Sequence, residues 1–200
     1  MRLIGLSGYA RSGKDEAAKV LVEEYGFTRL AFADKLRDVL YALDPIVSVW
    51  QEWDSEPGLV TVQTVVDRYG WNGYKETMYG EEVRRLLQRL GTEAGRQTLW
   101  DSIWVDATLH DLDPNGNYVV TDARFPNEAS AIRERGGYLW RINRDGVGPA
   151  NQHASEISLD NEKFDYTIWN NGSLEEYHQQ VRDVMAMYAQ DAENWKKVLE

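Results

Sequence analysis

The 200-residue chain is 42% hydrophobic and 12% aromatic, which is enough for one well-buried α/β domain and hardly enough for two. Its net charge of −11 argues against binding to long nucleic acid, although a single nucleotide gripped by a few arginines remains compatible with it. The absence of cysteine excludes disulfides and thiolate metal sites. No run of about 20 apolar residues could span a membrane, and no signal peptide is expected, so we expect a cytoplasmic protein.

The first predicted element is a strand at residues 2–7 that leads into a glycine-flanked loop and then a helix. From Gly8 to Lys14 the spacing is G-x-x-x-x-G-K, in which backbone N–H groups surround phosphate oxygens and the lysine reaches the β- and γ-phosphates. The next helix would aim its positive dipole end at the same anion. The candidate phosphate-binding residues are Gly8, Arg11, Ser12, Gly13, Lys14, Asp15 and Glu16.

The residue after Lys14 departs from the usual motif, which continues with Ser or Thr as a ligand of Mg²⁺. Here Asp15 takes that position and is the predicted metal ligand, with Glu16 next to it. Either position 16 tolerates any residue and Glu16 points along the helix to solvent, or Glu16 has taken over part of the metal site. A glycine-rich turn that matches the motif by chance is the alternative, and the strand-loop-helix context counts against it.

Gly26 is predicted to end the first helix, and residues 27–32 to form a second strand. A helix over 33–41 follows and stops before Pro45. Its Arg37 is either a ligand for an acceptor phosphate or a solvated surface residue. From residue 46 to 79 aromatic residues alternate with Pro and Gly, and only residues 61–69 look helical. We interpret residues 44–80, approximately, as an acceptor-side insertion.

A helix that begins near Glu81 has two stripes with helical spacing. The members of the predicted buried stripe are Val83, Leu86, Leu87, Leu90 and Ala94. The neighbouring polar stripe, with Arg85 beside it, consists of Arg84, Gln88, Gly91, Thr92 and Gly95. Each glycine costs about 1 kcal/mol inside a helix, which the close approach of a ligand would offset. The alternative is a solvated face with a helix break at Gly91.

Residues 98–107 are expected to continue as helix and to carry two tryptophans, Trp100 and Trp104. At least one of them should lie in the core, while Trp104 could wall a base pocket. A strand over 118–122 then ends in Asp122. In a parallel sheet, ligands bind at the carboxyl ends of strands, so the segment from Asp122 to Glu128 is expected beside the phosphate loop, with Asn127 as a helix cap.

The last third of the chain is predicted to contain strands at 138–144 and 165–170, with a polar loop and the cluster His153-Ala154-Ser155-Glu156 between them. The lone His153 is interpreted as structural, because a zinc site is improbable in this chain. Ser173 and Glu176 form a capping box that opens a final amphipathic helix. The residues expected to face inward from it are Leu174, Tyr177, Val181, Val184 and Tyr188.

These landmarks resemble those of the bacteriophage deoxynucleoside monophosphate kinases over nearly the whole chain. The segments that carry the resemblance are Ser12-Gly13-Lys14-Asp15, Phe32-Ala33-Asp34, Asp122-Ala123-Arg124-Phe125-Pro126-Asn127-Glu128, His153-Ala154-Ser155-Glu156 and Asn170-Asn171-Gly172-Ser173-Leu174. Relatives often have Thr where this chain has Glu16. The resemblance implies one P-loop NTPase domain, like a nucleoside monophosphate kinase. Its five-stranded parallel sheet would be flanked by helices, with a helical acceptor-side insertion and a lid near residues 144–160.

The resemblance also implies transfer of the γ-phosphoryl group of ATP, with Mg²⁺, to deoxynucleoside monophosphates. The positions that match the family's substrate and catalytic residues are Arg84, Arg85, Gln88, Gly91, Thr92, Trp104, Asp122, Arg124 and Glu128. We assign Lys14 to ATP, Arg124 to the transferring or acceptor phosphate, and Asp122 and Glu128 to the acceptor or to Arg124. Arg141 or Arg144 would close over ATP from the lid.

Two other functions stay open at this point: a P-loop kinase for another metabolite, such as dephospho-coenzyme A or a phosphomevalonate-like acid, and a nucleotide-binding protein without catalysis. The expected partners are small nucleotides and neither long nucleic acid nor a membrane. If the gene belongs to a phage, the host cytoplasm is the expected location. The sequence leaves the accepted bases, the exclusion of ribonucleotides and the oligomeric state open, a homodimer included.

Overall fold

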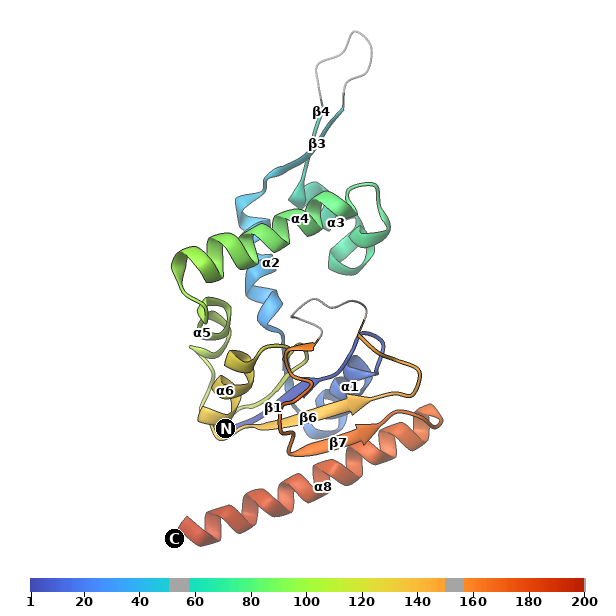
Figure 1. Cartoon of the computed structure of the whole chain (residues 1–200), viewed down its shortest axis with the longest axis vertical. Helices are drawn as coiled ribbons and strands as arrows, with labels where there is room; N and C mark the ends of the chain where they lie inside the picture. The colour runs from blue at the N-terminus through green and yellow to red at the C-terminus, as the bar shows by residue number, and fades with distance from the viewer. Residues whose placement is uncertain (51–57, 150–156, 200) are drawn as a thin grey trace. The chain divides into compact units, whose positions relative to one another are not determined.

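The computed structural model of the protein describes residues 1–50, 58–149 and 157–199 (Figure 1). They form two compact units, which are described separately. The first unit contains residues 1–31 and 111–200, and the second contains residues 32–110. None of the helices in the described ranges is long and apolar enough to cross a membrane.

The first unit is built on a five-stranded sheet in the order β2-β5-β1-β6-β7, with every neighbouring pair parallel. The strands are β1 (Arg2–Ser7), β2 (Thr28–Leu30), β5 (Asn117–Val120), β6 (Tyr138–Asn143) and β7 (Tyr166–Trp169). In register, Gly5 of β1 faces Val120 on one side and Leu139 on the other. The prediction of an α/β fold with a five-stranded parallel sheet flanked by helices is confirmed.

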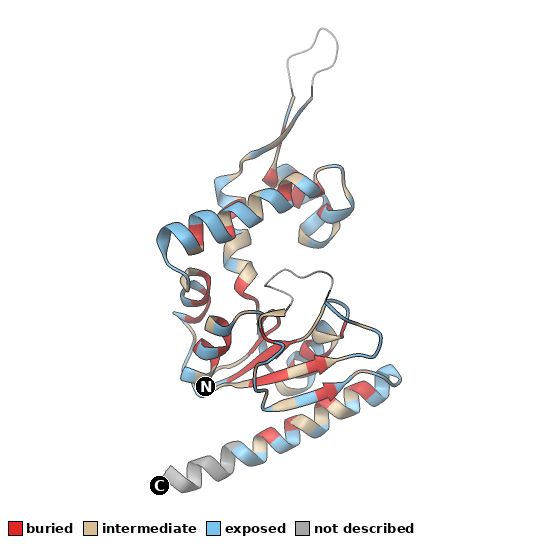
Figure 2. Ribbon diagram, in the orientation of Figure 1, coloured by how far each residue is buried: buried red, intermediate tan, exposed pale blue. Residues whose placement is uncertain are grey.

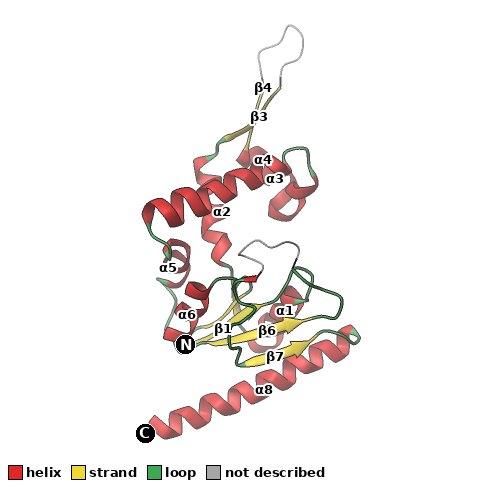
Figure 3. Ribbon diagram, viewed as in Figure 1, coloured by secondary structure: helices red, strands yellow, loops and turns green. Residues whose placement is uncertain are grey.

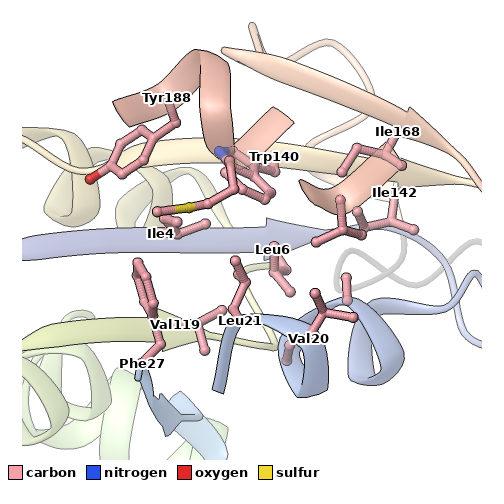
Figure 4. Packing of buried hydrophobic residues seen from close by; sticks show 14 of the residues in the cluster. Ile4, Leu6, Val20, Leu21, Phe27, Val119, Trp140, Ile142, Ile168 and Tyr188 are labelled. Atoms are coloured by element: carbon pink, nitrogen blue, oxygen red, sulfur yellow. The ribbon is translucent and has the colours of Figure 1, made fainter. Parts of the chain in front are cut away.

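Successive side chains of a strand point to opposite faces of the sheet. Helices cover both faces of this sheet and bury the apolar side chains there. On one face, α1 (Lys14–Tyr25) and α8 (Leu174–Leu199) lie side by side, and they bury Ile4 and Leu6 of β1 (Figure 4). On the other face, Ile132 of α6 (Pro126–Glu134) lies against Gly5. Buried residues therefore follow β1 and β6 along their length (Figure 2).

The ends of α1 and α8 follow the predicted capping signals. Gly26 ends α1 at a φ of 66°, and its N–H donates to the Leu21 carbonyl. At α8, the Ser173 N–H lies 2.7 Å from Glu176 Oε2, and the Glu176 N–H lies 3.3 Å from Ser173 Oγ. The capping box is thus confirmed.

The buried stripe of α8 differs from the predicted one at two positions. Tyr177, Val181 and Tyr188 are buried as expected. Leu174 is 60% exposed, because it is the first residue of the helix, one turn ahead of the stripe that meets the sheet. Met185, which was not predicted, is buried instead, since it continues the i, i+4 spacing of the stripe.

The second unit is mainly helical (Figure 3). Its elements are α2 (Phe32–Leu43), β3 (Ile46–Trp50), β4 (Gly58–Thr61), α3 (Val62–Gly73), the 3-10 helix η1 (Tyr74–Glu76), α4 (Gly80–Gln88), the π-helix η2 (Arg89–Leu99) and α5 (Ile103–Leu109). The antiparallel pair β3-β4 is not predicted from the sequence. The predicted helix over 61–69 is present, because Thr61 caps it and Gly70, at a φ of 70°, breaks it.

The continuation of α4 into a π-helix overturns the expected burial of Ala94. Ala94 is exposed, whereas Gly91 and Gly95 are buried, because the wider turn of a π-helix shifts the buried face away from a 3.6-residue spacing. Residues 98–107 are not one helix either. Trp100 has an extended backbone (φ −160°, ψ 153°) between η2 and α5, and this residue interrupts the helix.

Candidate functional site

The phosphate loop connects β1 to α1 in the first unit. Three of its residues have positive φ: Gly8 (152°), Arg11 (66°) and Gly13 (110°). A side chain on Gly8 would collide with the main-chain oxygen of Ile142, and a Cβ on Gly13 would lie 2.5 Å from Asn170 Nδ2. Both glycines of the motif are therefore required by backbone conformation and by close neighbours.

The polar groups of the loop suit a phosphate ligand. Lys14 Nζ donates to the carbonyl oxygens of Gly8 (2.6 Å) and Tyr9 (2.8 Å), which folds its ammonium group over the loop. Ser12 is 1% exposed, and its Oγ has no hydrogen-bond partner among the described residues. A buried hydroxyl without a partner, beside a lysine and a helix N-terminus, fits the phosphates of a nucleotide.

Asp15 and Glu16 have different surroundings at the start of α1. Asp15 is exposed, and its carboxylate makes no hydrogen bond or ion pair with another described residue. Glu16 is half-buried, and its Oε1 lies 2.9 Å from His178 Nε2 of α8 and 3.9 Å from Lys19 Nζ. The expectation that Glu16 points to solvent is therefore wrong, because α8 lies alongside α1.

The described residues fit Mg²⁺ in its nucleotide-bound form. Among the described residues, no group of three or more His, Asp or Glu side chains could hold a metal by itself. Mg²⁺ commonly binds through one or two carboxylates, waters and substrate phosphates, without an all-protein cage. A single carboxylate at Asp15 meets that requirement.

The second predicted segment follows β5, which is the neighbour of β1, so its residues lie at the same edge of the sheet as the phosphate loop. Arg124 is exposed there, whereas Glu128 is 2% exposed. Glu128 Oε2 accepts hydrogen bonds from the main-chain N–H groups of Arg124 (2.7 Å) and Phe125 (3.1 Å). The buried carboxylate thus fixes the backbone that carries Arg124.

The capping of α6 differs from the prediction. The helix begins at Pro126, a residue suited to the first helical position, and Phe125 precedes it. Asn127 is the second residue of the helix, and its side chain accepts from the N–H of the next residue, Glu128 (2.9 Å). Asn127 is therefore not the N-cap, which is Phe125, and the Glu128 side chain reaches back to accept from the N–H groups of Arg124 and Phe125 before the helix.

In the second unit, three of the predicted substrate residues line one surface hollow of about 500 Å³. The residues that line it are Met78, Glu81, Glu82, Arg84, Arg85 and Gln88. Arg85 makes two hydrogen bonds to Glu82, at 2.7 and 2.6 Å, and this pairing lowers the pKa of the Glu82 carboxyl. The charge of Arg85 is thus largely neutralised.

The charges of Arg84 and Arg37 both act on the hydroxyl of Tyr74. Burial raises the pKa of Tyr74, and the charges of Arg37 and Arg84 oppose that rise. Arg37 Nη1 also donates to Asp34 at 2.9 Å, and its guanidinium lies 5.9 Å from the centre of the Trp71 ring. Two arginines from different helices therefore bring positive charge to one phenol.

The glycines of the polar stripe are explained by side-chain packing. A Cβ on Gly91 would lie 3.0 Å from Leu36, and one on Gly95 would lie 2.7 Å from Trp104. Trp104 is 6% exposed and its indole donates to the Gly91 carbonyl at 2.8 Å. Trp104 is thus the tryptophan in the core, and little of its ring is left for a base. The two glycines make room for Leu36 and Trp104. Thr92 is exposed.

Arg141 does not lie in a lid. Its guanidinium bonds to Asp160 at 3.1 Å and lies 4.7 Å from the centre of the Tyr9 ring, and the Tyr9 hydroxyl donates to the same Asp160 at 2.8 Å. These contacts hold it beside the phosphate loop, so the lid assignment of Arg141 is corrected. Arg144 is exposed after β6. The cluster His153-Ala154-Ser155-Glu156 lies outside the described residues, as do Trp53 and part of the 144–160 region.

Two neighbours of the phosphate loop are not predicted from the sequence. Asn170 Nδ2 donates to the Ser12 carbonyl, and the Tyr177 hydroxyl donates to the Gly13 carbonyl, both at 2.9 Å. Asn170 directly follows β7, so the rule that ligands and loops meet at the carboxyl ends of parallel strands could have indicated it. Tyr177 has no such signal, because its spacing predicts only a core residue.

Comparison with known proteins gives a consistent result. A family model described as deoxynucleotide monophosphate kinase matches residues 61–181. A relative from Acanthamoeba polyphaga mimivirus, whose name refers to the same activity, is 34% identical over 200 residues and covers 90% of this chain and 94% of its own. The deoxynucleotide monophosphate kinase of Escherichia phage RB69 is 32% identical over 108 residues, which are 52% of this chain and 44% of that protein. A solved dephospho-CoA kinase from Campylobacter jejuni has a TM-score of 0.47 and 12% identity, over 96% of this chain and 100% of its own.

Proposed function

Because the chain belongs to the deoxynucleotide monophosphate kinase family, we propose that it transfers the γ-phosphoryl group of ATP to a deoxynucleoside monophosphate. The observation that carries the proposal is the buried Glu128, which holds the backbone of Arg124 at the edge of the sheet where the phosphate loop begins. An arginine fixed beside a phosphate loop can stabilise charge on a transferring phosphoryl group.

On the donor side, Lys14 and the N–H groups of the loop bind the ATP phosphates, and the buried Ser12 hydroxyl donates to them. Gly8 and Gly13 permit the loop to curl, and Arg11 adds charge at its rim. Asp15 would hold the Mg²⁺ that accompanies ATP, directly or through water. That ion would supply neutralisation of the phosphate charge.

On the acceptor side, Arg84, Arg85 and Gln88 bind the monophosphate, with Arg37 as a further cation and Thr92 as a further hydroxyl. Arg84 carries most of this charge, since Glu82 neutralises Arg85. Gly91 and Trp104 contribute by shaping the turn from α4 into η2, through the contacts described above. The arginines orient an anion, which supplies proximity without covalent chemistry.

At the edge of the sheet, Arg124 stabilises charge during transfer, and Asp122 orients either the acceptor or Arg124. Glu128 acts as a positioning residue through the main chain. The acceptor phosphate is already an anion, so no general base is required, and catalysis rests on orientation and charge neutralisation.

The test of the proposal is a coupled assay of ADP formation from ATP in the presence of Mg²⁺. The acceptors are the four deoxynucleoside monophosphates, the four ribonucleotides and dephospho-coenzyme A. Turnover is expected with at least one deoxynucleotide. Turnover with dephospho-coenzyme A alone would contradict the proposal, and so would ATP binding without any turnover.

Two further expectations belong to this proposal. The enzyme acts on nucleotides in the cytoplasm, the host's if the gene is viral, and needs neither long nucleic acid nor a membrane. Light scattering of the purified chain tests whether it forms a homodimer. The mechanism above does not depend on dimer formation.

A further inference from the structure

The junction of β7 and α8 contacts the phosphate loop at the two residues that precede Lys14. Asn170 Nδ2 donates to the Ser12 carbonyl at 2.9 Å, and the Tyr177 hydroxyl donates to the Gly13 carbonyl at 2.9 Å. These pairs are separated by 158 and 164 residues in the chain. The two contacts grip consecutive peptide groups, those between Ser12 and Gly13 and between Gly13 and Lys14.

A planar trans peptide links the direction of each carbonyl to that of the next N–H, because the two bonds point in opposite directions. Holding the Ser12 carbonyl toward Asn170 therefore turns the Gly13 N–H away from Asn170. Holding the Gly13 carbonyl toward Tyr177 turns the Lys14 N–H away from α8 in the same manner. These two N–H groups belong to the part of the motif that donates to phosphate oxygens.

The Ser12 peptide depends on this support more than the Gly13 peptide does. The Gly13 carbonyl also accepts the first helical bond of α1, from the Ala17 N–H at 3.0 Å. The Ser12 carbonyl lies before the helix, and Gly13 has a φ of 110°, outside the helical range. Asn170 thus fixes a peptide group that the helix does not hold.

The packing around Gly13 makes these contacts tight. A Cβ on Gly13 would lie 2.5 Å from Asn170 Nδ2 and 3.3 Å from the Tyr177 ring. Tyr177 is 0% exposed and belongs to the hydrophobic core under α1 and α8, so its ring cannot move away easily. Burial, together with the nearby Glu16, raises the pKa of the Tyr177 phenol, which therefore keeps its proton and remains a donor.

We propose that Asn170 and Tyr177 are positioning residues for ATP. From the side of the loop opposite to the nucleotide, they orient the N–H groups of Gly13 and Lys14 toward the phosphates. The proposal rests on the proposed function, since it concerns the same phosphate loop. It gives the β7-α8 junction a role in ATP binding, in which neither residue contacts the substrate itself.

The first experiment compares Tyr177→Phe with Tyr188→Phe by measuring the Kd for ATP in a direct binding titration and the unfolding temperature. Both tyrosines are buried on α8, but Tyr188 lies 11 residues farther along, about 16 Å at 1.5 Å per residue. We expect Tyr177→Phe to raise the Kd about three- to tenfold, the effect of one lost hydrogen bond. Tyr188→Phe should leave the Kd unchanged.

The second experiment compares Asn170→Ala with Asn171→Ala. Asn171 lies in the same turn, and its Oδ1 accepts from the Asp145 N–H at 2.8 Å, so its loss disturbs the turn without touching the phosphate loop. Asn170→Ala should raise the Kd for ATP at least as much as Tyr177→Phe does, because the Ser12 peptide has no helical bond. The KM for the deoxynucleotide should stay within twofold in all four variants.

The outcomes separate this inference from the proposed function. If the wild-type protein binds ATP and all variants bind it equally well, the positioning role is overturned while the kinase proposal stands. A loss of thermal stability in Tyr177→Phe and Asn170→Ala with an unchanged Kd would also overturn it, since both residues would then be structural. If the wild-type protein itself fails to bind ATP, both proposals fall.

Discussion

His178 Nε2 of α8 lies 2.9 Å from Glu16 Oε1 in the first turn of α1. The contact joins residues 162 positions apart and gives a carboxylate of the phosphate-loop helix a partner on the last helix. Asp15, the preceding residue, is exposed and bonds to none of the described side chains. The two acidic residues after Lys14 are therefore not equivalent, and only Asp15 presents a carboxylate at the start of the helix without such a contact.

This difference predicts how each substitution affects the response to metal. Asp15→Asn should strongly weaken the Mg²⁺ dependence of kcat, because it removes the charge that holds the ion. Glu16→Thr should leave that dependence unchanged and lower stability by about 1 kcal/mol, the upper end of the range for ion pairs near the surface. The measurement is a Mg²⁺ titration of kcat at saturating ATP and acceptor. The reverse result, with Glu16→Thr abolishing the response, would assign the metal to Glu16.

Arg124→Ala should lower kcat by on the order of 10³ or more, the scale for a charge-stabilising arginine in phosphoryl transfer. The matched control is Arg135→Ala, because Arg135 lies at the far end of α6 and its guanidinium bonds to the Ala131 carbonyl. Steady-state kinetics measures kcat for both variants, and circular dichroism should show an intact fold in both. A normal kcat for Arg124→Ala would make that residue structural.

Glu128→Ala should destabilise the protein by about 1 to 3 kcal/mol, because it leaves two main-chain N–H groups of a partly buried turn without their acceptor. Glu134→Ala, on the exposed face of the same helix, is the control and should change the free energy of unfolding by less than about 0.5 kcal/mol. Urea denaturation of both variants measures the difference. Equal stability of the two would show that Glu128 does not hold the Arg124 backbone.

The sheet and the phosphate loop could be predicted because their signals are local. Apolar runs, Gly26 and the capping box at Ser173 each specify a strand or a helix end within a few residues. The β3-β4 pair could not, because Pro45 and scattered aromatic residues obscure two short strands. The contact of Glu16 with His178 could not either, because it depends on which helices become neighbours on the sheet.

Gly95→Ala should destabilise the second unit by about 1 to 3 kcal/mol, because the added methyl group would lie 2.7 Å from the rigid ring of Trp104. Gly91→Ala should cost less, since its neighbour at 3.0 Å is the flexible end of Leu36. Thermal unfolding of the two variants measures the order. A change in the KM for the deoxynucleotide without a loss of stability would restore the view that these glycines make room for a ligand.

Arg84→Ala should raise the KM for the deoxynucleotide by more than Arg85→Ala does, although both residues line the same hollow. The reason is that two hydrogen bonds to Glu82 already neutralise Arg85. Adding Glu82→Gln to Arg84→Ala should recover part of the affinity, because it releases the charge of Arg85. An Arg85→Ala effect as large as that of Arg84→Ala would show that the pair with Glu82 opens when substrate binds.

The polar stripe shows where sequence reasoning on the candidate site fails. The spacing of Arg84 and Gln88 correctly places them on one face, because α4 is a regular α-helix there. Beyond Gln88 the helix widens, so Gly91 and Gly95 turn inward and Ala94 turns outward. A π-helix has no propensity signal of its own, and the packing of Trp104 against Gly95 becomes evident only in three dimensions.

The central position of β1 has a consequence for biosynthesis. Its partners on either side, β5 and β6, begin at Asn117 and Tyr138, more than a hundred residues later in the chain. At about 5 to 20 residues per second, the ribosome needs roughly 5 to 25 s to supply them, and the first strand has no neighbour during that interval. The residues that brace the phosphate loop, Asn170 and Tyr177, are translated later still. A nascent chain therefore exposes the nucleotide-binding motif early but becomes able to use it only near the end of synthesis.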